Sequence, residues 1–278
     1  MSTYIGNNDI SGIYIGSSAI TAIYVGTDVI YTSGDNTKYL SFTSQQDNSS
    51  VALNTVGTPS AITLEYSTDK QTWNTWDLST ITLNSGDKMY LRGDNATFSS
   101  SDSNYYKFVM SGSIAASGSI MTLMDKTDTL RTVTDRCFNK LFSQCTALTV
   151  APELPATTLG VHSYDCTFEY CSNLAVVPSI LPATALTEYC YSAMFRYTNI
   201  RKAPVLPATT LVILCYNEMF RGCSNLNEVT SYANTIDYLS LNNWLNGVAG
   251  SGTFYNYGGA TYPSGNSGIP SGWTEVTQ

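Results

Sequence analysis

The second half of this chain repeats a phrase of an aromatic residue, a cysteine three positions later and a branched apolar residue three positions further on. The apolar positions that close the four copies, 148, 174, 200 and 226, follow one another at a constant interval. A fixed period within the range of about 20–50 residues is typical of solenoids, in which a repeat buries its apolar face only against the next repeat. The copies are Phe142, Cys145, Leu148; Phe168, Cys171, Leu174; Phe195, Tyr197, Ile200; and Phe220, Cys223, Leu226. The third copy is one residue short, and we interpret Tyr197 as the replacement for its cysteine.

A second recurring string, which contains Leu-Pro-Ala-Thr, lies between these phrases at residues 154–157, 181–184 and 206–209. Prolines around a short apolar run exclude a long helix and a central antiparallel strand. Each repeat therefore predicts a short strand, as at residues 148–150, then a proline-bounded loop. A short helical or irregular return, as at residues 215–220, completes the repeat. Short parallel strands stacked along one axis follow from this pattern.

The phrase Phe-x-x-Cys-x-x-Leu, together with the Pro-Glu-Leu-Pro-Ala-Thr-Thr-Leu string at residues 152–159, resembles the BspA-like leucine-rich repeats of gut Bacteroidales and their phages. The resemblance covers residues 126–278. It implies leucine-rich repeats over residues 126–230 and a C-terminal cap over residues 231–278. The family implies an adhesive or ligand-binding surface and supplies no catalytic residue.

Residues 1–34 contain short β-branched runs closed by glycine, with two copies of Ile-x-x-Ile-Tyr-(Ile/Val)-Gly at residues 10–16 and 20–26. Such runs predict strands and turns. A segment this short buries little area alone, so we expect it to meet a partner. It resembles N-terminal segments of phage tail and fibre proteins, which implies attachment or oligomerisation; a small β-meander on the neighbouring domain is the alternative. The residues expected at that contact are Tyr4, Ile5, Ile13, Tyr14, Ile15, Ile23, Tyr24 and Val25.

Residues 35–125 change to alternating strands separated by polar turns. Seven candidate strands lie at residues 40–42, 51–53, 62–66, 81–83, 89–91, 108–110 and 120–123. Their number and spacing favour an antiparallel β-sandwich of immunoglobulin-like type, with Trp73 or Trp76 as the core anchor. The predicted fold class is therefore mainly β throughout, and this domain is expected to act as a spacer or a second binding face.

Composition limits the choice of partner. Charged residues make up only 12% of the chain, whereas tyrosine occurs 20 times. Such a surface suits carbohydrate, whose hydroxyl groups take hydrogen bonds while its C–H faces stack on rings. The net charge of −8 argues against nucleic acid or an anionic membrane as partner. No run of 18 apolar residues predicts a membrane span.

Neither a metal site nor an active site is indicated. The seven cysteines all lie in the repeats, none forms a Cys-x-x-Cys pair, and His162 is the only histidine. We expect the cysteines to pack as small buried apolar groups, and we expect no metal and no cofactor. The neighbours of His162, namely Ser163 and Asp165, do not form a triad by sequence proximity alone. The protein is therefore predicted to be non-enzymatic.

Taken with the resemblance, these features predict a non-enzymatic phage virion protein, either a tail or head fibre or a decoration protein, that binds the host surface. The absence of a signal peptide at Met1 favours a virion over the alternative, a cell-surface or secreted BspA-like adhesin. Expected partners are other virion proteins at the N-terminus and a host glycan or protein at the repeats. A homo-oligomer is expected, with a trimer as one form. The candidate ligand-binding residues are Tyr191, Arg196, Tyr197, Tyr216 and Arg221.

Overall fold

The computed structural model describes residues 14–15, 18–19, 22–25, 28–32 and 38–277. The chain divides into two compact units, Met1–Thr37 and Lys38–Gln278. Almost all described secondary structure is β. Among the described residues, the one helical element is a short 3-10 helix, η1 (Ile120–Leu123). The mainly β fold class predicted from the sequence is confirmed.

The described residues of the first unit form two short antiparallel pairs. Strand β1 (Tyr14–Ile15) pairs with β2 (Ser18–Ala19), and β3 (Ala22–Val25) pairs with β4 (Asp28–Thr32). The expected contact residues Tyr4, Ile5 and Ile13 lie outside the described residues. Those at positions 14, 15 and 23–25 lie in β1 and β3. Their role in attachment or oligomerisation stays a prediction.

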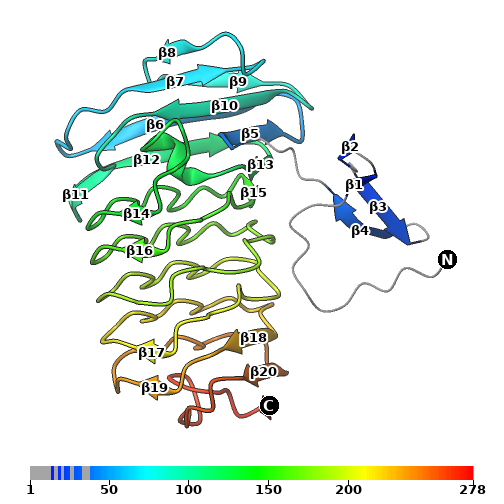
Figure 1. Ribbon diagram of the computed structural model, residues 1–278, viewed down its shortest axis with the longest axis vertical. Coiled ribbons are helices and arrows are strands. Elements are labelled where there is room, and N and C mark those ends of the chain that lie inside the picture. Colours follow the sequence, from blue (N-terminus) through cyan, green and yellow to red (C-terminus); the bar gives the residue numbers. More distant parts are fainter. Residues whose placement is uncertain (1–13, 16–17, 20–21, 26–27, 33–37, 278) are drawn as a thin grey trace. The chain divides into compact units, whose positions relative to one another are not determined.

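Two sheets form the start of the second unit (Figure 1). Phe42 and Phe108 from opposite sheets meet between them at a centroid distance of 5.1 Å, and the buried Trp76 stacks on Phe108. Of Trp73 and Trp76, the two candidates for the core anchor, Trp76 is therefore the buried one. The six-stranded sheet has the order β15 (Leu148–Val150), β13 (Ile114–Ser117), β5 (Leu40–Ser44), β10 (Lys88–Gly93), β7 (Leu64–Ser67) and β8 (Asn74–Trp76). The four-stranded sheet has the order β11 (Ser99–Ser101), β12 (Asn104–Ser111), β6 (Ser49–Val56) and β9 (Ile81–Leu83).

Six of the seven strands expected in this region are present, but the seventh prediction was wrong. Residues 120–123 form η1 because Ser119 caps the segment, its side chain accepting a hydrogen bond from the Met121 N–H at 3.2 Å. The Thr122 hydroxyl also donates to the Ser119 carbonyl at 2.9 Å, which closes the turn. The sequence analysis did not predict β8, β11 and β13.

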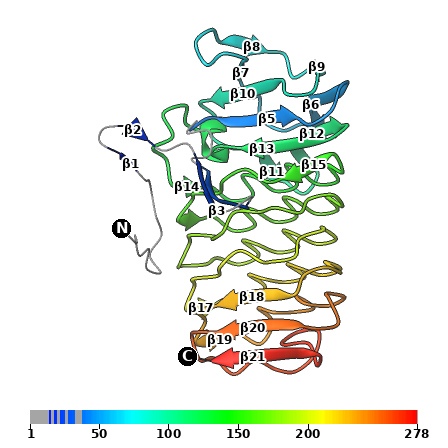
Figure 2. The ribbon, with the colours of Figure 1, turned by 90° about the vertical axis from the view of Figure 1, so that its right-hand side faces the viewer.

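From about residue 132 to residue 277 the chain forms a solenoid of stacked coils, which Figures 1 and 2 show running from the two sheets to the C-terminus. Short parallel pairs join successive coils, which confirms the predicted parallel stacking. Two of the strands in these pairs, Thr158–Leu159 and Thr210–Leu211, lie where the sequence predicted a loop. Isolated parallel bridges between single pairs of residues, such as Val150–Val176 and Lys202–Glu228, join further neighbouring coils. The strands are β14 (Thr132–Val133), β16 (Thr158–Leu159), β17 (Thr210–Leu211), β18 (Glu228–Ser231), β19 (Thr235–Ile236), β20 (Gly252–Asn256) and β21 (Trp273–Thr277).

The two sheets and the coils share one core. Strand β13 pairs in parallel with β15, so the larger sheet leads directly into the first coil. Two columns of aromatic rings then run through the coils, with centroid distances between 4.8 and 6.3 Å. One column comprises Phe108, Phe142, Phe168, Phe195 and Phe220, the other Phe98, Phe138, Tyr164, Tyr191 and Tyr216, and both reach Trp244.

The recurring cysteines lie inside this stack. The Cys145 thiol donates to the Phe108 carbonyl of β12, and the Cys171 thiol donates to the Phe142 carbonyl of the preceding coil, both at 3.0 Å. All seven cysteines are free, and all but Cys166 are buried, which confirms their packing as small buried groups. In the third copy the place of the cysteine belongs to Thr198, which is buried and contacts Cys223 Sγ at 3.3 Å. Our assignment of that place to Tyr197 was wrong.

Asp125 orders the loop that leads from the two sheets into the first coil. Its carboxylate accepts hydrogen bonds from the Thr127 N–H at 2.9 Å, the Thr129 N–H at 2.8 Å and the Leu130 N–H at 2.9 Å. The Thr127 hydroxyl adds the strongest of these interactions, and together they outweigh burial and lower the pKa of Asp125 below its usual range. The loop therefore depends on an ionised carboxylate.

Candidate binding face on the stacked turns

One side of the solenoid is built from five runs of consecutive turns, which we call the turn runs. They span residues 135–144, 161–170, 188–197, 213–222 and 238–247. In the first four runs every fourth residue has a positive φ, for example Leu214, Glu218 and Gly222 at 56°, 52° and 74°. The return that the sequence predicted as short helical or irregular is therefore a regular series of turns without a helix.

Hydrogen bonds of two kinds alternate along each of the first four turn runs. The N–H groups of Cys137 and Asn139 close turns onto carbonyls three residues earlier, at 3.2 and 2.9 Å. The N–H groups between them point to the next coil, as in Phe138 to the Ser163 carbonyl at 2.9 Å. Left-handed backbone costs about 1–2 kcal/mol for a residue with a side chain. The hydrogen bonds between coils offset that cost, so the geometry persists for tyrosine and leucine as well as glycine.

The positive-φ positions bring side chains of successive coils into register along the outside of the solenoid. We call this surface, comprising the outward side chains of the three turn runs at residues 161–170, 188–197 and 213–222, the turn face. In two of these coils Tyr170 and Tyr197 are 42% and 39% exposed. Their rings stack nearly in parallel, at 4.9 Å and 7°. A Cβ at Gly222 would lie 2.3 Å from the Tyr197 ring. The backbone of the next coil therefore covers the face of the Tyr197 ring that Tyr170 does not cover. The pair therefore presents ring edges and hydroxyl groups to a ligand.

A chain of alternating charges crosses three coils beside this pair. Arg196 Nε donates to Glu169 Oε1 at 2.7 Å, and its Nη1 pairs with Glu218. Arg221 Nη1 pairs with the other oxygen of Glu218 at 2.5 Å. Burial acts to lower the pKa of Arg196, but the hydrogen bonds and charge of Glu169 and then of Glu218 outweigh it and raise the pKa. The chain is balanced in charge and links coils, with Arg221 its most exposed member.

His162 belongs to the turn face but lies in no catalytic arrangement. Its Nδ1 lies 2.8 Å from Asp165 Oδ2, and its ring stacks on Tyr189 at 4.4 Å. Ser163 is fully buried, and its hydroxyl has no partner among the residues that the structure describes. The Cys166 thiol donates to Asp165 at 3.2 Å, and burial, with the charges of Asp165 and Glu169, raises its pKa. These side chains provide no activated nucleophile.

The structure separates the five ligand-binding residues that the sequence suggested. Tyr197 and Arg221 lie on the turn face, and Arg196 lies within the charge chain. Tyr191 and Tyr216 are each 1% exposed, within the second aromatic column, and burial raises the pKa of both hydroxyl groups. Side chains this deeply buried offer no surface to a ligand. The prediction that Tyr191 and Tyr216 contact a ligand is therefore corrected.

Tyr170 was not predicted as a ligand-binding residue, although its position in the repeat is equivalent to that of Tyr197. The two residues follow Phe168 and Phe195 by the same interval, two positions after each phenylalanine of the first aromatic column. That shared offset from the repeat phrase identifies equivalent positions in neighbouring coils. Of this equivalent pair, Tyr197 was among the predicted ligand-binding residues and Tyr170 was not.

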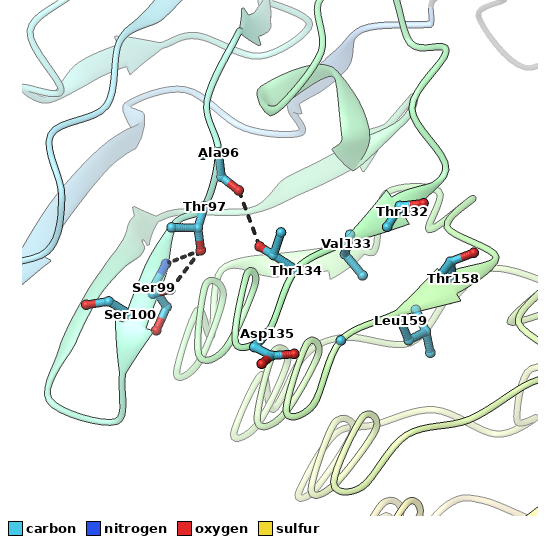
Figure 3. Close-up of a pocket in the computed structure, with 11 residues that line it drawn as sticks. Ala96, Thr97, Ser99, Ser100, Thr132, Val133, Thr134, Asp135, Thr158 and Leu159 are labelled. Carbon is cyan, nitrogen blue, oxygen red and sulfur yellow. Dashed lines mark hydrogen bonds between the residues drawn. The ribbon is translucent and has the colours of Figure 1, made fainter.

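A cleft of about 670 Å³ lies between the β11 segment and the first two coils (Figure 3). Hydroxyl groups line it, among them those of Thr97, Ser99 and Thr132, and Asp135 is the carboxylate at its wall. Thr134 Oγ1 donates to the Ala96 carbonyl across it at 3.3 Å. Its volume is in the range of small-molecule sites. It lacks the aromatic rings of the turn face, so it offers a ligand only polar edges and small apolar groups.

Three further observations concern metal ions, membrane spans and similar proteins. Within the described ranges, no three His, Cys, Asp or Glu side chains gather closely enough to hold a metal ion. No helix in the described part of the chain is long and apolar enough to span a membrane. No protein-family model, curated protein or solved structure proved significantly similar to this chain.

Proposed function

We propose that this protein is a non-enzymatic phage virion fibre, adhesion or decoration protein that uses the turn face to bind the surface of its bacterial host. The observation that carries the proposal is the turn face itself. Outward side chains recur at fixed intervals over successive coils, and they are held by the hydrogen-bonded turns beneath them. A rigid array of this kind suits binding across several repeats, because little conformational entropy is lost when the ligand binds.

The proposed chemistry of the contact comes from Tyr170, Tyr197 and Arg221. The two tyrosines present ring edges and hydroxyl groups, and Arg221 has 37% of its side chain exposed beside them. Tyrosine and arginine are the residues that contribute most often to tight protein contacts. Tyrosine hydroxyl groups also suit the hydroxyl groups of a glycan. A host-surface glycan or glycoprotein is the partner that this combination favours.

The finer fold assignment is part of the same proposal. We propose that the two-sheet region is an immunoglobulin-like spacer and that the coils are divergent BspA-like leucine-rich repeats. The constant interval between the repeats and the Phe-x-x-Cys-x-x-Leu phrase support the second assignment. In these coils the cysteine and the leucine are both buried, as Cys171 and Leu174 illustrate.

The test is the binding of fluorescently labelled full-length protein to a panel of capsulated and acapsular Bacteroidales strains. The proposal predicts saturable binding to some strains and none to others, because surface glycans differ between strains. Binding to no strain, or equal binding to all, would contradict it. The variant Tyr238→Ala is a matched control, since Tyr238 opens the last turn run, two coils beyond Tyr197, and is 85% exposed, so its loss should disturb no packing.

Immunoelectron microscopy separates the virion from the alternative, a bacterial cell-surface or secreted adhesin. Antibodies against the protein should label phage particles if it is a virion component. Labelling of the envelope of uninfected bacteria, without labelling of particles, would favour the adhesin. The experiment needs no knowledge of the receptor.

We further propose that residues 1–34 attach the protein to other virion proteins or assemble it into a homo-oligomer, with a trimer as one form. Light scattering on the full chain and on a chain beginning at Lys38 tests assembly through this segment. A larger mass for the full chain alone is the expected result. Equal monomer masses would exclude self-assembly through residues 1–34.

A further inference from the structure

A second aromatic surface lies on the parallel sheet at the C-terminal end of the solenoid, formed by β18, β20 and β21 (Figure 2). Side chains alternate between the two faces of these strands. Ser231 and Asn256 are buried on the inner face, whereas Tyr232, Tyr255 and Tyr257 lie on the outer one. We call these three tyrosines the tyrosine platform.

The rings of the tyrosine platform are arranged differently from the stacked pair on the turn face. Tyr232 and Tyr257 meet edge to face, at 5.6 Å and 69°. Tyr255 and Tyr257 are tilted by 51° at 5.7 Å. Because neither pair is stacked, no ring lies flat over the face of another, and the edge-to-face contact covers only part of one face. Tyr232 is 38% exposed, and the other two are half-buried.

The groups around the tyrosine platform are nearly uncharged. Register places Thr230 beside Tyr255 on one neighbouring strand and Thr253 beside Glu228, and it places Val276, which is 37% exposed, beside Tyr255 on the other neighbouring strand. Glu228 is the charged side chain of this outer face among the residues described, and Lys202 neutralises it at 2.7 Å. The surface therefore offers ring faces, hydroxyl groups, one apolar side chain and one balanced ion pair.

We infer that the tyrosine platform is a binding site for neutral polysaccharide. The C–H face of a pyranose ring packs on an aromatic face, while its hydroxyl groups take hydrogen bonds from neighbouring threonines. Residues two apart on a strand are about 7 Å apart, so the platform accommodates on the order of one to two sugar rings. A neutral ligand fits because no net charge on this face attracts or repels it. The inference rests on the proposed function for the source of the carbohydrate.

The test is affinity electrophoresis of the full-length protein in native gels containing dextran, mannan or galactan, with the acidic polysaccharide alginate for comparison. We expect at least one neutral polysaccharide to retard the wild-type protein. The combined variant Tyr232→Ala, Tyr255→Ala and Tyr257→Ala should bind at least about tenfold more weakly, since stacking on two or more rings is lost. The Tyr238→Ala control should migrate like the wild type.

The variant Tyr255→Phe guards against a folding defect, because it keeps the ring and removes only the hydroxyl group. It should retain binding within about threefold. Retardation by alginate alone, by no neutral polysaccharide, or equally for the combined variant would overturn the inference. If the combined variant still binds cells strain-selectively, the proposed function stands without the platform. If the wild-type protein binds no strain, the proposed function itself is wrong.

Discussion

Truncation of Phe195 to alanine perturbs the aromatic column at its centre. Phe195 is fully buried, and its ring stacks on Phe168 and Phe220 at 5.6 and 5.9 Å, with an interplanar angle of 3° in each pair. Removal of a buried phenylalanine side chain costs about 3–5 kcal/mol of unfolding free energy. The position within that range depends on how far the surroundings can collapse into the cavity.

The neighbouring coils cannot close this gap easily, because backbone hydrogen bonds fix the distance between them. The Phe168 N–H donates to the Met194 carbonyl, and the Phe195 N–H donates to the Met219 carbonyl, both at 2.9 Å. We therefore expect Phe195→Ala to cost about 4–5 kcal/mol, the upper part of the range. A loss of that size is a large fraction of the stability of a typical domain, about 5–15 kcal/mol.

Urea unfolding followed by far-ultraviolet circular dichroism measures this difference. The variant Phe195→Leu is the control, because it keeps much of the buried volume and should cost only about 1–2 kcal/mol. A loss below about 1.5 kcal/mol for Phe195→Ala, or equal losses for the two variants, would show that the coils do collapse into the space left by the ring.

Three further predictions concern individual groups. The Tyr164 hydroxyl is buried without a hydrogen-bond partner among the described residues, so Tyr164→Phe should leave stability unchanged or raise it by about 1 kcal/mol in urea unfolding; a clear loss would contradict this. Gly222→Ala and Gly247→Ala both place alanine at positive φ, but only at position 222 does the new Cβ meet the Tyr197 ring, at 2.3 Å against a nearest contact of 3.5 Å at position 247. Gly222→Ala should therefore be less stable than Gly247→Ala by about 1–3 kcal/mol. Equal unfolding temperatures for the two variants would show that the alanine side chain at position 222 does not clash with the Tyr197 ring. The pKa of Asp125 is lowered in the folded protein, so its contribution to stability is present above its ordinary pKa of about 4 and is lost as the pH falls below that value. Asp125→Asn should reduce the dependence of the unfolding free energy on pH between about pH 5 and pH 2. An unchanged slope would show that the Asp125 carboxylate does not contribute to this dependence.

The sequence predicted the solenoid because its period is a property of buried residues. Leu148, Leu174, Ile200 and Leu226 are all fully buried, and the constant interval between them matches one coil of the solenoid. The recurrence of the cysteines in the same phrase predicted their burial. These features depend on which residues recur, and a sequence displays that directly.

The turn runs could not be predicted in the same way. Residues such as Tyr197 and Leu214 have no intrinsic preference for positive φ, and hydrogen bonds to the next coil impose it. Without the four-residue period of the turns, the buried Tyr191 could not be distinguished from the exposed Tyr197. At the tyrosine platform Ser231 is buried and Tyr232 is exposed, so hydrophobicity alone would assign these two residues to the wrong faces.

The proposed function places the contact with the host on the turn face. The dissociation constant of labelled full-length Tyr170→Ala/Tyr197→Ala protein on a strain that binds the wild type tests this contact. We predict binding at least about tenfold weaker, with Tyr238→Ala unchanged, because only the double variant loses the exposed ring pair. Wild-type affinity in a double variant that remains folded by circular dichroism would contradict the claim and place the receptor contact elsewhere on the molecule.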